Sequence, residues 1–310
     1  LTILYLSITI VIFLGYFLAG MGVFDAICHS FTTSSTGGLS TRALSIGSFD
    51  SPAIEWVATV GMLVGGLNLG ILWLVWKRKF TDIRQNSELR LYLVILVIST
   101  CIFWWKLDTG FAVVTELRNA FFVAASLLST TGYVNMGWEF TSGMSAVALL
   151  ILAIGGMAGS TGGGFGVHRL LEIIKYLRRE LTLSYRPSAV RAIKVSGEEI
   201  EQRELDKLHG YTATFIFIVA GGAFLLSLAS QHLNLAESIG LALSSFVTSG
   251  PGLTTATSVG VEHNAVSNIV LSSLMVIGRL SIFPIAYAVL FSTRNLRLGL
   301  FGFRRKTGID

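Results

Sequence analysis

The sequence predicts an all-α membrane protein built from three copies of one unit: a spanning helix, a short helix, a polar turn and a second spanning helix. Two observations lead to this prediction. The 310 residues are 52% hydrophobic and 13% charged, with a mean hydropathy of +0.69, whereas soluble domains carry about 25% charged residues. In addition, one or two hydroxyl residues followed by glycine occur three times, each time between a short apolar segment and a long one.

The basic residues gather at the ends of the apolar segments. The formal net charge is +5, but the basic residues are not interleaved with aromatic ones, so we expect no nucleic-acid partner. Lys and Arg are enriched in the cytoplasmic loops of membrane proteins. We therefore place three basic clusters in the cytoplasm: residues 77–90, 175–207 and 294–306.

The residues that carry most enzyme chemistry are sparse. The two cysteines, Cys28 and Cys101, lie far apart in apolar stretches, which favours neither a disulfide framework nor a metal cluster. No paired carboxylates, no nucleophile beside a base and no metal-ligand spacing stand out. We therefore do not expect an enzyme, and we expect no cofactor bound by this chain.

The first predicted unit covers residues 1–80. Residues 1–20 are apolar and long enough to cross a hydrocarbon core of about 30 Å. Residues 24–35 form a short helix, and a polar turn follows with the sequence Thr36-Gly37-Gly38-Leu39-Ser40-Thr41. Residues 53–76 form the second span and end at a basic run, which returns the chain to the cytoplasm.

The same order recurs twice more. The unit at 81–181 has a span at 88–105, a short helix at 116–129, a turn at 130–133 and a long apolar run at 142–181 that glycines interrupt. A charged cytoplasmic linker follows at 182–208. The unit at 209–310 has a span at 211–228, a short helix at 237–247, a turn at 248–253, a span at 265–291 and a basic tail. This gives six spans and three re-entrant segments, in parallel repeats about an axis along the membrane normal.

The three turns predict a central cation pore. Irregular backbone survives at membrane depth only where protein buries it or water reaches it, so the turns must meet at an aqueous axis. Each short helix would aim its negative C-terminal end at that axis, and backbone carbonyls would replace the hydration shell of a cation. The spacing does not identify the ion. The candidate filter residues are Thr36, Gly37, Gly38, Thr131, Gly132, Tyr133, Ser249, Gly250 and Pro251.

Acidic residues lie at or near the start of each short helix. They are Asp25, Glu116 and Glu237. A carboxylate at this end is stabilised by the helix dipole, so a local structural role is one interpretation. Collection of cations at the outer mouth is the other.

Two features point to a gate. A glycine-rich run, residues 159–166, interrupts a membrane span, although each glycine inside a helix costs about 1 kcal/mol relative to alanine. It indicates either a functional loop or a kink that lets neighbouring helices approach. Arg279 lies deep in the last span, where a basic residue indicates function or a fixed partner. No lysine of a phosphate-binding loop follows these glycines, which argues against a nucleotide site.

Several motifs resemble the Trk/Ktr/HKT superfamily of potassium transporters, and most closely its bacterial TrkH type. The resemblance covers essentially the whole chain. It is carried by Ser35-Thr36-Gly37-Gly38-Leu39-Ser40-Thr41, Ser129-Thr130-Thr131-Gly132-Tyr133, the run from Gly155 to Gly164, Ser249-Gly250-Pro251-Gly252-Leu253, and Gly278-Arg279-Leu280. Members have four units around one pore, so the three units here correspond to the second, third and fourth. The first repeat has no counterpart, and the opening at Leu1 suggests a truncated chain.

The resemblance also implies a function and its residues. It implies channel-like potassium uptake across the bacterial inner membrane, with potassium held at Gly37, Gly132 and Gly250. The implied gate is Gly159, Ser160, Thr161, Gly162, Gly163, Gly164 and Arg279. Implied partners are a second copy of the chain, the lipid bilayer and a cytosolic ring of nucleotide-binding regulatory subunits. A sodium-selective or sodium-coupled relative, and a non-conducting fragment that binds partners, remain open as alternatives.

Overall fold

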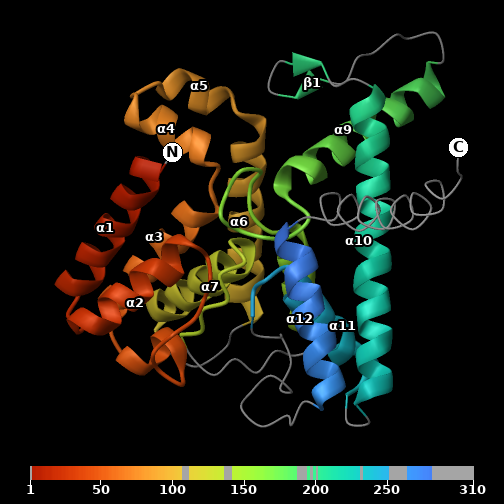
Figure 1. The fold of residues 1–310 in the computed structure, drawn as a ribbon. Helices are drawn as coiled ribbons and strands as arrows, with labels where there is room; N and C mark the ends of the chain where they lie inside the picture. The colour runs from red at the N-terminus through yellow and green to blue at the C-terminus, as the bar shows by residue number, and fades with distance from the viewer. Residues whose placement is uncertain are drawn as a thin grey trace, which may run out of the picture.

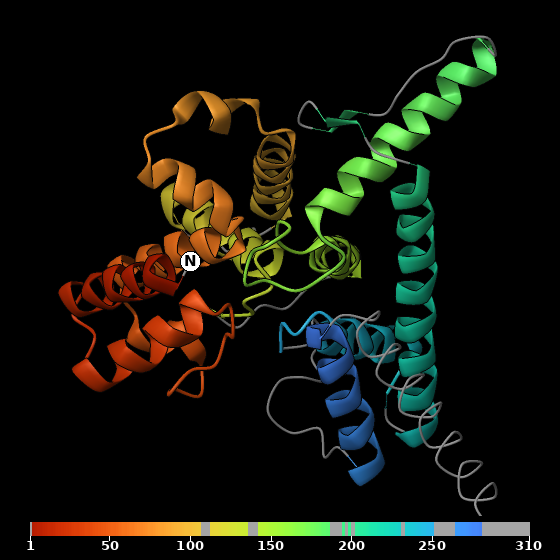
Figure 2. The ribbon, with the colours of Figure 1, turned by 45° about the horizontal axis from the view of Figure 1, so that its top comes forward.

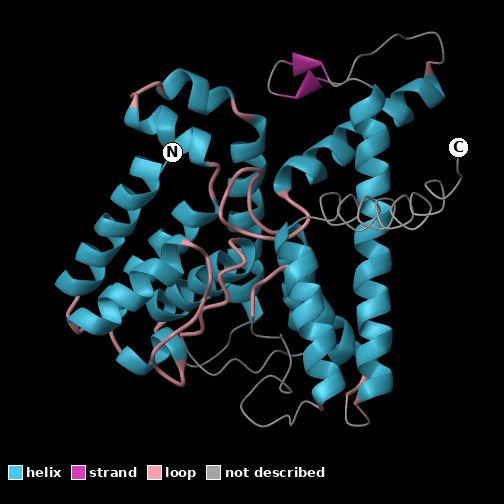
Figure 3. Ribbon diagram, viewed as in Figure 1, coloured by secondary structure: helices cyan, strands magenta, loops and turns pink. Residues whose placement is uncertain are grey.

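A computed structural model describes residues 2–106, 112–135, 142–186, 194–195, 198–199, 202–230, 233–250 and 264–280. Over these ranges the chain is helical except for loops and one two-residue antiparallel ladder, β1 (Lys194–Val195) with β2 (Glu198–Glu199). Figure 3 shows this dominance of helices. The predicted all-α class is confirmed.

The helices form three triples with the same internal packing. In each triple the first helix packs on the second, the second on the third, and the first on the third. Figure 2 separates the triples by colour, from red through yellow-green to blue. The triples are α1 (Thr2–Leu18), α2 (Val23–Ser34) and α3 (Pro52–Gly66); α6 (Ser87–Lys106), α7 (Val113–Leu128) and α8 (Ser142–Ile154); and α10 (Gln202–Ala229), α11 (Leu235–Phe246) and α12 (Ala265–Leu280).

Neighbouring triples meet in the same way. The third helix of one triple packs on the short helix of the next, as α3 on α7 and α8 on α11. Because the same pair of elements meets at both junctions, the triples follow one another in a single rotational sense. The short helix α7 lies innermost, with Ala120, Phe122, Ala124 and Leu128 fully buried.

The second predicted span is not a straight helix. By length and composition, α6 and α10 each suffice to cross a membrane, whereas α3 and α4 (Leu69–Trp76) reach that length only together. A bend of 105° separates the two. The chain breaks at Leu67 and Asn68, and the Asn68 side chain accepts a hydrogen bond from the Gly70 N–H at 2.6 Å, which caps α4. The predicted span over residues 53–76 therefore consists of two helices that meet at a sharp bend.

The remaining elements lie within or between the triples. The 3₁₀ helix η1 (Ser45–Phe49) precedes α3, and α5 (Phe80–Gln85) joins α4 to α6. The long run at 142–181 is interrupted as predicted, and α9 (Val167–Tyr185) continues it after the glycines. Helix α10 begins at Gln202, earlier than predicted, because the charged end of the expected linker forms its first turns. The part of the last predicted span beyond Leu280 lies outside the described residues.

Candidate functional site

The chain leaves all three short helices by the same turn. One residue after each C-cap, a threonine adopts the left-handed region, and two residues later a glycine does so too. The threonines Thr36, Thr130 and Thr248 have φ values of 52°, 59° and 60°. The glycines Gly38, Gly132 and Gly250 have φ values of 66°, 80° and 83°.

The same two hydrogen bonds close each turn. The threonine N–H donates to the carbonyl three residues earlier, at 3.1 Å in all three turns. The following N–H donates to the carbonyl five residues earlier, at 2.7, 3.0 and 3.0 Å. This is the Schellman closure of a helix, in which glycine usually occupies the left-handed position. A β-branched residue there is strained by about 1–3 kcal/mol, and such strain gathers at functional sites.

This geometry corrects the register of the first motif. Gly38, not Gly37, occupies the position of Gly132 and Gly250, because Gly37 has no left-handed φ. Because Gly37 and Gly38 are adjacent, the sequence alone did not show which of them corresponds to Gly132 and Gly250. Pro251, also a candidate filter residue, lies outside the described residues.

The first and second turns touch directly. A Cβ on Gly38 would collide with the Thr131 carbonyl, so only glycine fits there. Behind the turns, the buried Tyr133 hydroxyl lies 2.5 Å from the Thr32 hydroxyl and 3.1 Å from the Thr33 hydroxyl. Tyr133 follows the second turn while Thr32 and Thr33 belong to α2, so this residue joins two triples.

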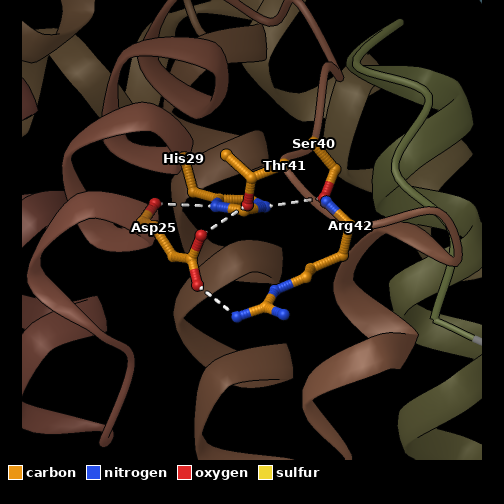
Figure 4. A network of polar contacts seen from close by, with 5 residues as sticks. All are labelled: Asp25, His29, Ser40, Thr41 and Arg42. Atoms are coloured by element: carbon orange, nitrogen blue, oxygen red, sulfur yellow. Dashed lines mark hydrogen bonds and ion pairs between the residues drawn. The ribbon is translucent and has the colours of Figure 1, made fainter.

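A polar network fixes the segment that follows the first turn (Figure 4). His29 Nδ1 lies 2.7 Å from the Asp25 carbonyl, so Nδ1 donates, and neutral Nε2 accepts from the Ser40 hydroxyl at 2.9 Å. The Asp25 carboxylate accepts from Thr41 at 2.6 Å and pairs with Arg42 at 2.9 Å. Asp25 therefore has structural partners, which favours the local interpretation of this acid.

Glu237 likewise has a local role. Its carboxylate accepts from the Asn234 N–H at 2.9 Å, in a capping box at the start of α11. The capping box is a common way to satisfy the free N–H groups of a helix start.

One glycine-rich loop, residues 155–166, reaches the end of every short helix. The Thr161 hydroxyl donates to the Ser34 carbonyl at 3.0 Å, at the end of α2. The Gly163 N–H donates to the Thr130 hydroxyl at 2.7 Å, in the second turn. A Cβ on Gly163 would collide with the Val247 carbonyl at the end of α11. Figure 1 shows the loop between the first and third triples.

The break after α3 supplies partners to this loop. The Met157 N–H donates to the Gly66 carbonyl at 3.0 Å, and the Thr161 N–H donates to the Gly65 carbonyl at 3.2 Å. The last carbonyls of a helix lack partners within it. The bend in the first triple and the loop of the second therefore satisfy each other's backbone groups.

Arg279 reaches the loop from the third triple. Its guanidinium donates to the Thr161 carbonyl at 2.9 Å. A cavity of about 360 Å³ lies here, lined by residues 156–164 together with His168, Arg169, Tyr211, Thr248, Gly278 and Arg279. No acidic side chain lines the cavity within the described ranges. Residues 159–164 and Arg279, predicted together from the sequence, thus line one positively charged space.

Sequence reasoning missed two buried acids. Glu55 pairs with Arg118 across α3 and α7 at 2.7 Å, and Glu88 accepts a hydrogen bond from the loop residue Ala158. Both lie in the first turns of long apolar helices, where an acid is usually only a favourable helix-start residue. Over the described residues, no group of three or more His, Cys, Asp or Glu side chains is arranged to hold a metal ion.

Comparisons with known proteins agree with this architecture. The sequence profile of the TrkH family, described as cation transport proteins, matches residues 1–295. The Trk system potassium uptake protein TrkH of Salmonella typhimurium is 32% identical over 291 residues, covering 91% of this chain and 59% of that protein. TrkG of Escherichia coli is 30% identical over 283 residues, covering 89% of this chain and 57% of that protein.

A solved structure has the same fold. The crystal structure of the potassium transporter TrkH from Vibrio parahaemolyticus matches with a TM-score of 0.84 at 29% identity, covering 91% of this chain and 62% of that one. The fold and the turns thus define a multi-pass membrane protein of the cation-transporter class. The chain belongs to the TrkH family of cation transport proteins. It spans 59% and 57% of the lengths of the two potassium uptake proteins named above.

Proposed function

We propose that this chain forms part of a channel-like pathway for potassium uptake across the bacterial inner membrane. The observation that carries the proposal is the identical turn at the end of α2, α7 and α11, with its left-handed threonine and glycine. The negative end of each short helix and the backbone carbonyls of the turn that follows it would then face a cation. The names of the matched relatives, potassium uptake proteins, support the choice of ion.

The proposed filter consists of the three turns. Its residues are Thr36, Gly37, Gly38, Thr131, Gly132, Tyr133, Ser249 and Gly250, with Pro251 proposed from the sequence alone. In the corrected register, potassium would be coordinated near Gly38, Gly132 and Gly250. A closed fourfold ring needs a fourth equivalent turn, which we propose is a further repeat of the complete transporter.

The proposed gate is the loop residues 159–164 with Arg279. Loop contacts with all three helix ends support an obstacle beneath the filter. The guanidinium adds charge: two like charges about 4 Å apart repel by about 4 kcal/mol at an effective dielectric constant near 20. In the resting protein the loop and Arg279 would therefore block cations, and conduction would require both to shift.

The proposed partners are a second copy of this chain and a cytosolic ring of nucleotide-binding regulatory subunits. The basic cytoplasmic segments offer a surface for such subunits. Sodium selectivity or sodium coupling, and a non-conducting fragment that binds partners, are the competing functions. We propose no enzymatic activity and no cofactor.

Ion flux in liposomes tests the proposal. Purified protein is reconstituted in vesicles, and potassium and sodium fluxes are measured under matched gradients. We expect potassium flux at least about tenfold above sodium flux. A Gly132→Ala variant should lose this flux, because the φ of 80° at Gly132 disfavours any side chain and the turn would be distorted. The variant should remain folded, since the change is confined to the turn. Sodium flux faster than potassium flux would support a sodium-selective or sodium-coupled transporter. No flux from folded protein would support a non-conducting fragment that binds partners.

A further inference from the structure

Helix α6 begins with a buried carboxylate. Glu88 is only 6% exposed, and no Lys or Arg side chain in the described ranges forms an ion pair with it. An ionised carboxylate in such a place is costly unless hydrogen bonds compensate for lost water. The groups that donate hydrogen bonds to Glu88 are therefore the parts of the structure that its charge stabilises.

Two backbone groups stabilise that charge. The Ala158 N–H donates to Glu88 Oε1 at 2.7 Å, and the backbone N–H of His168 favours the charge more weakly. Helix α9 begins at Val167, so the His168 N–H is one of the donors that a helix start leaves free. The positive end of α9 also attracts the charge.

The two donors lie on either side of the glycine run. Ala158 comes directly before Gly159, and His168 comes two residues after Gly166. One carboxylate from α6 thus holds both ends of the loop that contacts the three short helices. A loop that moved away would leave the charge buried without its strongest donor, since hydrogen bonds to ionised groups are about twice as strong as neutral ones.

We propose that Glu88 is the positioning residue that holds the glycine-rich loop closed. The inference rests on the proposed function of that loop as a gate. Glu88 stabilises the closed arrangement from the cytoplasmic side, through loop positions other than Thr161, which Arg279 contacts. It does not contact the filter turns, so its removal changes how often the pathway opens and not which ion passes.

The variant Glu88→Gln tests the proposal. Glutamine keeps the shape and one acceptor oxygen but loses the charge, so the loop opens more often. We expect potassium flux without any stimulus to rise about tenfold, with the potassium-to-sodium ratio unchanged. Glu88→Asp, which keeps the charge, should restore part of the closure. Glu180→Gln, the same change at an exposed site on α9, is the matched control and should behave as wild type.

Hydrogen exchange in nanodiscs provides a second measurement. The amides of residues 156–168 should exchange faster in Glu88→Gln than in wild type or Glu180→Gln, while α7 stays protected. Unchanged exchange in folded Glu88→Gln would overturn the proposal. Faster exchange with unchanged flux in Glu88→Gln would also overturn it. In that case, potassium flux through the wild-type protein would still support the proposed function. If wild type carried no flux, the proposed function would fail, and exchange alone would decide the role of Glu88.

Discussion

The three left-handed threonines hold more strain than glycine would at the same positions. The left-handed conformation costs each threonine about 1–3 kcal/mol of backbone strain. Each threonine also carries a hydroxyl that glycine lacks. Thr130 uses that hydroxyl to accept from the Gly163 N–H, which links the second turn to the loop. In the second turn, threonine therefore supplies a contact to the loop that glycine could not make.

Tyr133 provides a test at the same scale. In Tyr133→Phe the Thr32 and Thr33 hydroxyls lose a buried partner, which costs about 1–3 kcal/mol. The first and second turns should then move relative to each other. We expect thermal unfolding a few degrees lower and a reduced potassium-to-sodium flux ratio, measured by differential scanning fluorimetry and vesicle flux.

Tyr92→Phe is the matched control for this change. The Tyr92 side chain is 1% exposed, and its hydroxyl has no hydrogen-bond partner among the residues that the structure describes. Its loss should therefore leave stability and selectivity unchanged. Equal behaviour of the two variants would rule out a specific role for the Tyr133 hydroxyl.

Residue patterns predicted where the turns lie, but not how they are closed. Hydroxyl residues before glycine placed all three turns correctly, because glycine reaches a positive φ without a steric clash. The register of the first turn was wrong by one, since Gly37 and Gly38 look alike in a sequence. The partners of Tyr133 were not predictable, because they lie on another triple.

At the scale of elements, the two broken helices are complementary. The glycine-rich break was predictable from its composition, whereas the break after α3 was not recognised within an apolar stretch. A local signal was present: Gly65 and Gly66 precede Asn68, which is a favourable N-cap residue. The break makes sense only with the loop, whose N–H groups bind the freed carbonyls of α3.

Arg279 gives a prediction for the gate as an element. Replacing Arg279 with alanine removes both the bond to the Thr161 carbonyl and the positive charge. About 1.4 kcal/mol changes a rate tenfold, so even a screened part of the repulsion should raise resting potassium leak at least tenfold. Single-channel or vesicle flux recordings measure this. Arg279→Lys should keep most of the block, and an unchanged or lower leak in folded Arg279→Ala would contradict the barrier.

At the scale of the whole molecule, the repeat explains the arrangement. The all-α class, the three units and their order were predictable from hydropathy and the recurring motif. The packing of α3 on α7 and of α8 on α11 was not, because sequence periodicity says which faces are apolar and not which faces meet. The repetition of that junction supports an axis shared by the three turns.

The most direct test of a cation pathway at the three turns is crystallography of the protein with thallium ions, which replace potassium and scatter anomalously. If cations pass the three turns, anomalous peaks should lie beside the backbone carbonyls of residues 36–38, 130–132 and 248–250, and competing potassium should weaken them more than sodium does. Thallium bound elsewhere, with no peak at these turns, would contradict it.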